Sequence, residues 1–366
     1  MAQESWLVKP VSSACNLRCR YCFYRDVAAH RKVGNYGRMS EEVLRKTIGQ
    51  ICRGLSAKDQ LRVAFQGGEP TLAGLDYFRL AAELLEEMAP GVRKELSLQT
   101  NGILLTDEWC DFLRRNHFLV GLSLDGDHDL HDENRVDAEG KGTWARVMEA
   151  KRRLERSGVP YNVLCTLTAR HARCPERLWN FFRKQNVRYL QFTPCLASFD
   201  AVSEPWALTP ERFESFYTRL LPLWERGLQS DEPVSVKFFD DLLHLMTRKE
   251  VTACGLTGRC TIQNVVEADG SVYPCDFYVL DEWRLGSVLA EGEMPEPQKA
   301  ERFLQRERPE LPICGGCRFR YMCGGGCRRM RGSMYVNAGG TFCGYRAFLE
   351  KNEEKLERIA SLFAER

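Results

Sequence analysis

The chain has 366 residues, of which 44% are hydrophobic and 28% are charged. This composition is typical of a globular protein with a sizeable core and room for more than one domain. A net charge of +2 argues against a general binder of nucleic acid or anionic membranes. No apolar run approaches the ~20 residues of a membrane span, and the first residues do not resemble a signal peptide. We therefore expect a cytoplasmic protein without nucleic-acid or membrane partners.

Strand-like and helix-like runs alternate over the first two-thirds of the chain. Ser40, Thr106 and Thr209 are typical helix N-caps, and Pro210 suits a first helical position. The alternation predicts an α/β fold with parallel strands, and polar residues after several strands favour a barrel or part of one. Periodicity leaves open whether the barrel closes. The expected strands are 6–11, 61–66, 96–100, 119–124, 161–167 and 189–192, and the expected helices are 40–51, 77–88, one from 106, 143–156, 175–185, 209–220, 238–246 and 345–363.

Three cysteines lie close together just after the first expected strand. Cys19 and Cys22 alone would suit a zinc half-site or a redox dithiol. Cys15 adds a third thiol, and no fourth cysteine or histidine follows at ligand spacing. This pattern favours a cubic iron–sulfur cluster with one iron open to a ligand that is not protein. A closed zinc site, or cysteines that only pack, are the alternatives.

Eight of the 16 cysteines fall between Cys254 and Cys343, in a glycine-rich stretch with little expected helix. In a reducing compartment they are more often ligands than disulfides. Two zinc sites of four cysteines each would tolerate such spacings. We expect no chemistry from the cysteines in helical or strand patterns, since free cysteine is a small buried hydrophobe, and leave Cys195 open. The cysteines outside the two groups are Cys52, Cys110, Cys165, Cys174 and Cys195.

The histidines show no convincing metal spacing. His128 and His131 lie in a polar, aspartate-rich stretch. We therefore expect both side chains to be solvated.

The cysteine loop, with an aromatic residue before its last cysteine, resembles the signature of the radical S-adenosylmethionine (SAM) superfamily. Gly67-Gly68-Glu69-Pro70, after an expected strand, is similar to that superfamily's GGEP motif. The resemblance implies a partial (β/α)6 barrel and a 4Fe–4S cluster whose open iron binds SAM. Without the resemblance, each of these features has a simpler interpretation: the glycine motif as an ordinary turn, Ser123 as a capping hydroxyl and Arg135 as a solvated charge. The implied cluster ligands are Cys15, Cys19 and Cys22, and the implied SAM contacts are Tyr21, Gly67, Gly68, Glu69, Pro70, Ser123, Arg135 and Leu196.

The C-terminal cysteines resemble the SPASM extension of peptide-modifying radical enzymes, which holds two auxiliary 4Fe–4S clusters. The resemblance implies a radical SAM barrel over 1–235, a SPASM domain over 236–345 and a C-terminal helix over 346–366. The implied ligands are Cys254, Cys260, Cys275 and Cys327 for one cluster, and Cys314, Cys317, Cys323 and Cys343 for the other.

The segment 270–286, with 22–24, 65–67 and 97–102, is similar to the anaerobic sulfatase-maturating enzymes. That resemblance implies oxidation of a cysteine or serine in a Cys/Ser-x-Pro-x-Arg segment of an unfolded sulfatase to Cα-formylglycine, after a 5′-deoxyadenosyl radical removes a Cβ hydrogen. Asp276 is the expected general base, because it follows a cluster ligand directly; a turn carboxylate is the alternative. Tyr24 and Gln66 are expected to face the substrate.

The same resemblance implies a monomer with an electron donor such as flavodoxin or ferredoxin. A peptide crosslinking or cyclising enzyme with the same extension is one alternative function. A zinc-stabilised scaffold without catalysis is the other.

Overall fold

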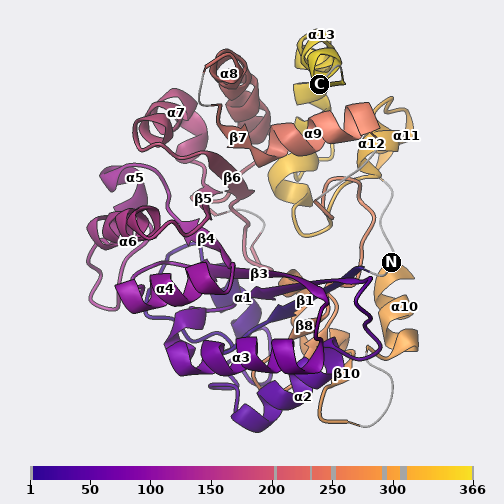
Figure 1. Ribbon diagram of the computed structural model, residues 1–366. Helices are drawn as coiled ribbons and strands as arrows, with labels where there is room; N and C mark the ends of the chain where they lie inside the picture. Colours follow the sequence, from indigo (N-terminus) through magenta and orange to yellow (C-terminus); the bar gives the residue numbers. More distant parts are fainter. Residues whose placement is uncertain are drawn as a thin grey trace. The chain divides into compact units, whose positions relative to one another are not determined.

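The computed structural model describes residues 3–201, 204–230, 233–248, 253–290, 295–305 and 311–364 (Figure 1). The chain forms two compact units, each assembled from three separate segments. Within the described segments, no helix is both long enough and apolar enough to span a membrane. The first unit contains Met1–Ser123, Arg135–Tyr161 and Thr261–Arg306, and the second contains Leu124–Asn134, Asn162–Cys260 and Glu307–Arg366.

A mostly parallel sheet is the centre of the first unit. Its strands follow the order β10-β9-β8-β1-β2-β3-β4, and β1 pairs in parallel with both β2 and β8. Strand β9 pairs antiparallel with both β8 and β10, so these three strands extend the sheet beyond the N-terminal strand. The bounds are β1 Gln3–Val8, β2 Gln60–Phe65, β3 Arg93–Thr100, β4 Leu119–Ser123, β8 Val265–Val266, β9 Ser271–Tyr273 and β10 Gly286–Ser287.

Two helices of the first unit begin at the capping residues that the sequence indicates. The Ser40 hydroxyl accepts a hydrogen bond from the Val43 amide, and Thr106 does the same for Trp109, which satisfies an otherwise unpaired donor. Helices α2 and α3 lie side by side (Figure 1). The bounds are α1 Phe23–Ala29, α2 Glu41–Ile51, η1 Pro70–Ala73, α3 Leu75–Met88, α4 Asp107–Arg115, α6 Trp144–Arg156, η3 Asp276–Tyr278, η4 Asp281–Trp283 and α10 Pro297–Gln305.

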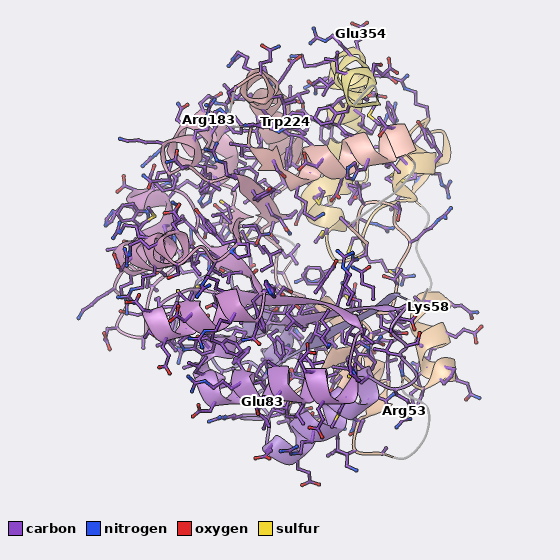
Figure 2. The ribbon with its side chains drawn as sticks, viewed as in Figure 1. Arg53, Lys58, Glu83, Arg183, Trp224 and Glu354 are labelled. Atoms are coloured by element: carbon purple, nitrogen blue, oxygen red, sulfur yellow. The ribbon has the colours of Figure 1, made fainter. Side chains whose placement is uncertain are left out.

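The second unit has an aromatic core beneath α8, and α13 packs beside α8. Trp224 is fully buried and lies 4.7 Å from Phe239 between ring centroids, whereas Arg183 and Glu354 are exposed on their helices (Figure 2). The bounds are β5 Tyr161–Leu167, β6 Tyr189–Pro194, β7 Ser235–Val236, α5 His128–Asp132, η2 His171–Arg173, α7 Pro175–Lys184, α8 Pro210–Leu228, α9 Lys237–Arg248, α11 Pro312–Gly315, α12 Arg320–Cys323, η5 Arg331–Tyr335 and α13 Gly344–Ala364.

All six expected strands are present, as β1 to β6. The pairs β1–β2, β2–β3, β3–β4 and β5–β6 are parallel, as expected. The eight expected helices are present too, and Cys52, Cys110, Cys165 and Cys195 are buried as small hydrophobes. The prediction of a solvated His131 is wrong. A short helix, α5, capped by Asp127, turns this side chain inward, and its Nδ1 accepts a 3.2 Å hydrogen bond from the Asp125 amide. His128 is exposed as expected.

Candidate active site

The cysteine loop and the glycine turn are built against each other in the first unit. Cys15, Cys19 and Cys22 are partly buried on the loop between β1 and α1. The Gly68 amide donates to the Ser12 carbonyl at 2.9 Å, and a Cβ on Gly68 would lie 1.9 Å from the Ala14 carbonyl oxygen. Only glycine allows this approach of two backbones. The turn after β2 therefore holds the loop that carries the three thiols.

Glu69 joins the ends of β2 and β3. Its side chain is almost completely buried and accepts hydrogen bonds from the Thr71 amide and hydroxyl, the Thr100 hydroxyl and the Asn101 amide, at 2.6 to 3.1 Å. Burial raises the pKa of this carboxyl, and the four hydrogen bonds act in the opposite direction. The Glu69 carboxylate therefore ties the end of β2 to the end of β3.

Two of the expected SAM contacts lie together at this end of the sheet. The guanidinium of Arg135 lies over the ring of Tyr21, 5.6 Å from its centroid. Ser123 ends β4, where its hydroxyl accepts a 3.1 Å hydrogen bond from Gln99 Nε2. Leu196 belongs to the second unit and is buried just after β6.

Asp276 lies where Tyr24 and Gln66 meet, so the structure brings together three residues that the sequence singled out. The Tyr24 hydroxyl donates to Asp276 Oδ2 at 2.6 Å, and Gln66 Nε2 lies 3.5 Å from the same oxygen. The other oxygen, Oδ1, is buried and accepts no hydrogen bond from the described residues. Burial raises the pKa of the Asp276 carboxyl, against the opposing effect of Lys9.

Sequence reasoning missed a buried group of charges behind Asp276. Lys9 Nζ lies 3.8 Å from Asp276 Oδ1 and 3.2 Å from Glu267 Oε1, and Arg31 Nη1 lies 2.6 Å from that same Glu267 oxygen. Burial would raise the pKa of Glu267, but the two cations outweigh it and hold the value at about 2. The available signal was a charged residue inside an apolar run, as at Val265-Val266-Glu267-Ala268.

Four C-terminal thiols face one small cavity in the second unit. Cys314, Cys317, Cys323 and Cys343 line a space of about 20 Å³, together with Tyr335 and Tyr345. Burial, with a smaller effect of the other three thiols, raises the pKa of Cys343 to about 11, against the opposing effect of a backbone hydrogen bond from Arg346. Across the described residues, no three histidine, cysteine or acidic side chains are arranged to ligate a single metal ion. Four thiols around one cavity fit the ligand set of a cubic cluster.

Three more thiols gather elsewhere in the second unit. The pKa of Cys254 is raised, first by burial of its thiol and then by the neighbouring thiols of Cys327 and Cys260. The loop that carries Cys254 is held closely, because a Cβ on Gly258 would lie 2.4 Å from the Cys323 carbonyl oxygen. Cys275, the expected fourth ligand, belongs to the first unit.

Comparison with known proteins identifies this arrangement. The model of the radical SAM superfamily matches residues 10–170. A cysteine-type anaerobic sulfatase-maturating enzyme of Clostridium novyi is 36% identical over 100% of both chains, and one of Clostridium perfringens is 39% identical over 91% of both. A serine-type enzyme of Bacteroides thetaiotaomicron is 31% identical over 89% of this chain and 82% of its own.

A solved structure of native anSMEcpe with bound AdoMet and Cp18Cys peptide has a TM-score of 0.88 and 35% identity, over 99% of this chain and 100% of that one. The fold, with its three-cysteine loop, thus defines an enzyme of the radical SAM class, and the expected α/β fold is confirmed. With relatives this similar over its whole length, the chain belongs to the anaerobic sulfatase-maturating enzymes.

Proposed function

We propose that this enzyme oxidises a cysteine, in preference to a serine, in a Cys/Ser-x-Pro-x-Arg segment of an unfolded sulfatase to Cα-formylglycine. The cysteine-type relatives are 36% and 39% identical to the chain, whereas the serine-type relatives are 30% and 31% identical. The observation that carries the proposal is the buried Asp276, held by Tyr24 directly after Cys275. The family favours this activity over peptide crosslinking.

The cofactors are SAM and three 4Fe–4S clusters. The three thiols on one loop fit the first cluster, and the thiols of the second unit fit the auxiliary clusters. When bound, these groups supply the 5′-deoxyadenosyl radical that abstracts the Cβ hydrogen, and an acceptor for the electron that remains. We propose the ligand sets Cys15, Cys19 and Cys22; Cys254, Cys260, Cys275 and Cys327; and Cys314, Cys317, Cys323 and Cys343.

The SAM site is proposed at the ends of β2 to β4. The turn at Gly67 and Gly68 belongs to this site because it holds the cysteine loop, with the Gly68 amide donating to the Ser12 carbonyl and the missing Cβ of Gly68 making room for Ala14. Arg135 would hold a carboxylate, and its contact with Tyr21 restricts its position. Ser123 would hold a hydroxyl. We assign Tyr21, Gly67, Gly68, Glu69, Pro70, Ser123, Arg135 and Leu196 to this site.

Asp276 would take the thiol proton of the substrate as its Cβ hydrogen is lost. A carboxylate is a weak base towards a thiol of pKa ~8.5, and burial narrows the difference by raising the pKa of Asp276. Tyr24 supports the carboxylate with a short hydrogen bond to Oδ2. Tyr24 and Gln66, which both donate hydrogen bonds to Asp276, would form the adjacent wall of the substrate site.

Four matched peptides test the proposal: Cys-x-Pro-x-Arg, Ser-x-Pro-x-Arg, and each with alanine in place of proline and arginine. Incubation with the reconstituted enzyme, SAM and reductant, followed by mass spectrometry, should show aldehyde on the cysteine peptide first. Equal turnover of the peptides that lack proline and arginine would contradict the sulfatase motif. Faster turnover of the serine peptide would contradict only the cysteine preference.

The remaining parts of the proposal concern the setting of the enzyme. We propose a cytoplasmic monomer that receives electrons from flavodoxin or ferredoxin. Functionally, we divide the chain into a radical SAM barrel at 1–235, a SPASM domain at 236–345 and a C-terminal helix at 346–366.

A further inference from the structure

A lysine and a glutamate are buried behind the oxygen of Asp276 that faces away from Tyr24. Lys9 and Glu267 are 1% and 0% exposed. The Lys9 ammonium lies 3.2 Å from Glu267 Oε1, 3.8 Å from Asp276 Oδ1 and 4.8 Å from the centroid of the Tyr24 ring. The Lys9 ammonium therefore lies next to Asp276, to Tyr24, which donates to Asp276, and to the carboxylate of Glu267.

The strands fix Lys9 and Glu267 next to each other. Val8 of β1 pairs with Val266 of β8, so the next residue of each strand falls at the same level. The Lys9 amide donates to the Val266 carbonyl at 2.9 Å. Strand β9, which leads to Asp276, is the antiparallel neighbour of β8. The register of the sheet therefore determines that Lys9 lies next to Glu267 and near the segment that carries Asp276.

The far side of the group is also closed. Arg31 Nη1 binds Glu267 at 2.6 Å, and Arg31 Nη2 donates to the Gly34 carbonyl at 2.7 Å. The lysine stem passes under the glycine turn, since a Cβ on Gly67 would lie 3.3 Å from both Lys9 Cβ and Cε. Lys9 therefore has little room to leave Asp276.

The charges of the group balance only when Lys9 is present. Two cations, Lys9 and Arg31, face two carboxylates, and Arg31 reaches Glu267. Without Lys9, the Asp276 carboxylate would lose its cation and keep Glu267 as a like-charged neighbour. A buried carboxylate in that position is unfavourable unless it moves.

We propose that Lys9, fixed by Glu267, is a positioning residue that holds Asp276 Oδ1 and thereby aims Oδ2 at the substrate. This inference rests on the proposed role of Asp276. Tyr24 restrains Oδ2, and Lys9 restrains Oδ1, so the plane of the carboxylate is set from both sides. A misplacement of about 1 Å at a reacting group can cost on the order of 100-fold in rate.

The test uses the full-length, reconstituted enzyme and a Cys-x-Pro-x-Arg peptide, with Lys9→Met as the variant. Methionine keeps the length of the stem but removes the charge. The measured quantity is the ratio of formylglycine formed to 5′-deoxyadenosine released, with iron content and the peptide KM recorded beside it. We expect this ratio to fall by roughly 10- to 100-fold, with iron retained and KM nearly unchanged. The control is Lys151→Met, a lysine of the same unit that is also buried and paired with one glutamate, Glu155.

A second variant distinguishes positioning from simple loss of packing. In Lys9→Met/Glu267→Gln the like-charged neighbour of Asp276 is gone as well, so the ratio should recover above that of Lys9→Met alone. A wild-type ratio in Lys9→Met, iron loss, or no recovery in the double variant overturns the proposal. If the wild-type enzyme itself forms no formylglycine, the proposed function fails first, and that result is visible before any variant is made.

Discussion

Tyr24 donates a 2.6 Å hydrogen bond to Oδ2 of Asp276, a residue 252 positions away along the chain. The tyrosine lies two residues after Cys22 of the cysteine loop, and the aspartate directly follows Cys275, another proposed cluster ligand. The contact therefore joins the segment that would hold the first cluster to the segment that carries the proposed base. Its replacement tests whether that link matters for the chemistry.

Tyr24→Phe should reduce formylglycine formation by about 10- to 100-fold. A hydrogen bond to a charged group contributes about 1.5–3 kcal/mol, and each 1.4 kcal/mol corresponds to about tenfold in rate. The measurement is the single-turnover rate with a cysteine peptide. Tyr77→Phe is the control, since Tyr77 is buried in the same unit and its hydroxyl donates to the Met39 sulfur at 3.1 Å rather than to a carboxylate. An equal loss in both variants would contradict a specific role for Tyr24.

Asp276→Asn should retain all three clusters and release 5′-deoxyadenosine, yet form very little aldehyde. Loss of a general base typically costs about 10²–10⁴-fold in rate, and asparagine preserves the shape of the side chain. Mass spectrometry of the peptide gives the yield, and iron analysis reports on the clusters. A formylglycine yield near that of the wild type would refute the assignment of the base.

Replacement of Cys15, Cys19 and Cys22 together by alanine should leave about eight of about twelve irons per chain, because each cubic cluster holds four. Release of 5′-deoxyadenosine should stop, since no open iron remains to bind SAM. Cys52→Ala is the control, as this thiol is buried and has no proposed ligand role. Continued SAM cleavage by the triple variant would show that the first cluster is assigned to the wrong residues.

Gly68→Ala should displace the first cluster selectively. The new methyl group would lie 1.9 Å from the Ala14 carbonyl oxygen, so the cysteine loop must move. We expect about four irons fewer per chain and a matching loss of SAM cleavage. Gly49→Ala, in α2, is the matched control: its Cβ has room, with the Met88 sulfur 4.0 Å away, and should stabilise the helix by up to about 1 kcal/mol. Full iron in Gly68→Ala would contradict the contact.

Local patterns predicted most of the elements and several residues of the site. Ser40, Thr106 and Thr209 cap helices because their side-chain oxygens need only the next turn of backbone. Tyr24, Gln66 and Asp276 could be singled out because each adjoins a motif. Lys9 and Glu267 were missed, since a charged residue at a strand end is usually solvated, and it is the long-range pairing of β1 with β8 that places them side by side. The prediction of a solvated His131 was wrong for the same reason, because tertiary packing buries this side chain although its local sequence is polar.

The pairing of β1 with β8 also constrains how the protein is made. Strand β1 is synthesised long before its neighbour β8, which begins at Val265. Until then, one edge of β1 has no partner strand from β8, and such exposed edges favour aggregation. The cysteine loop and the glycine turn are synthesised long before Asp276, so the part of the first unit that would bind the first cluster precedes the proposed base during translation. Correct assembly therefore depends on a late, long-range strand pairing, a slow kind of folding step.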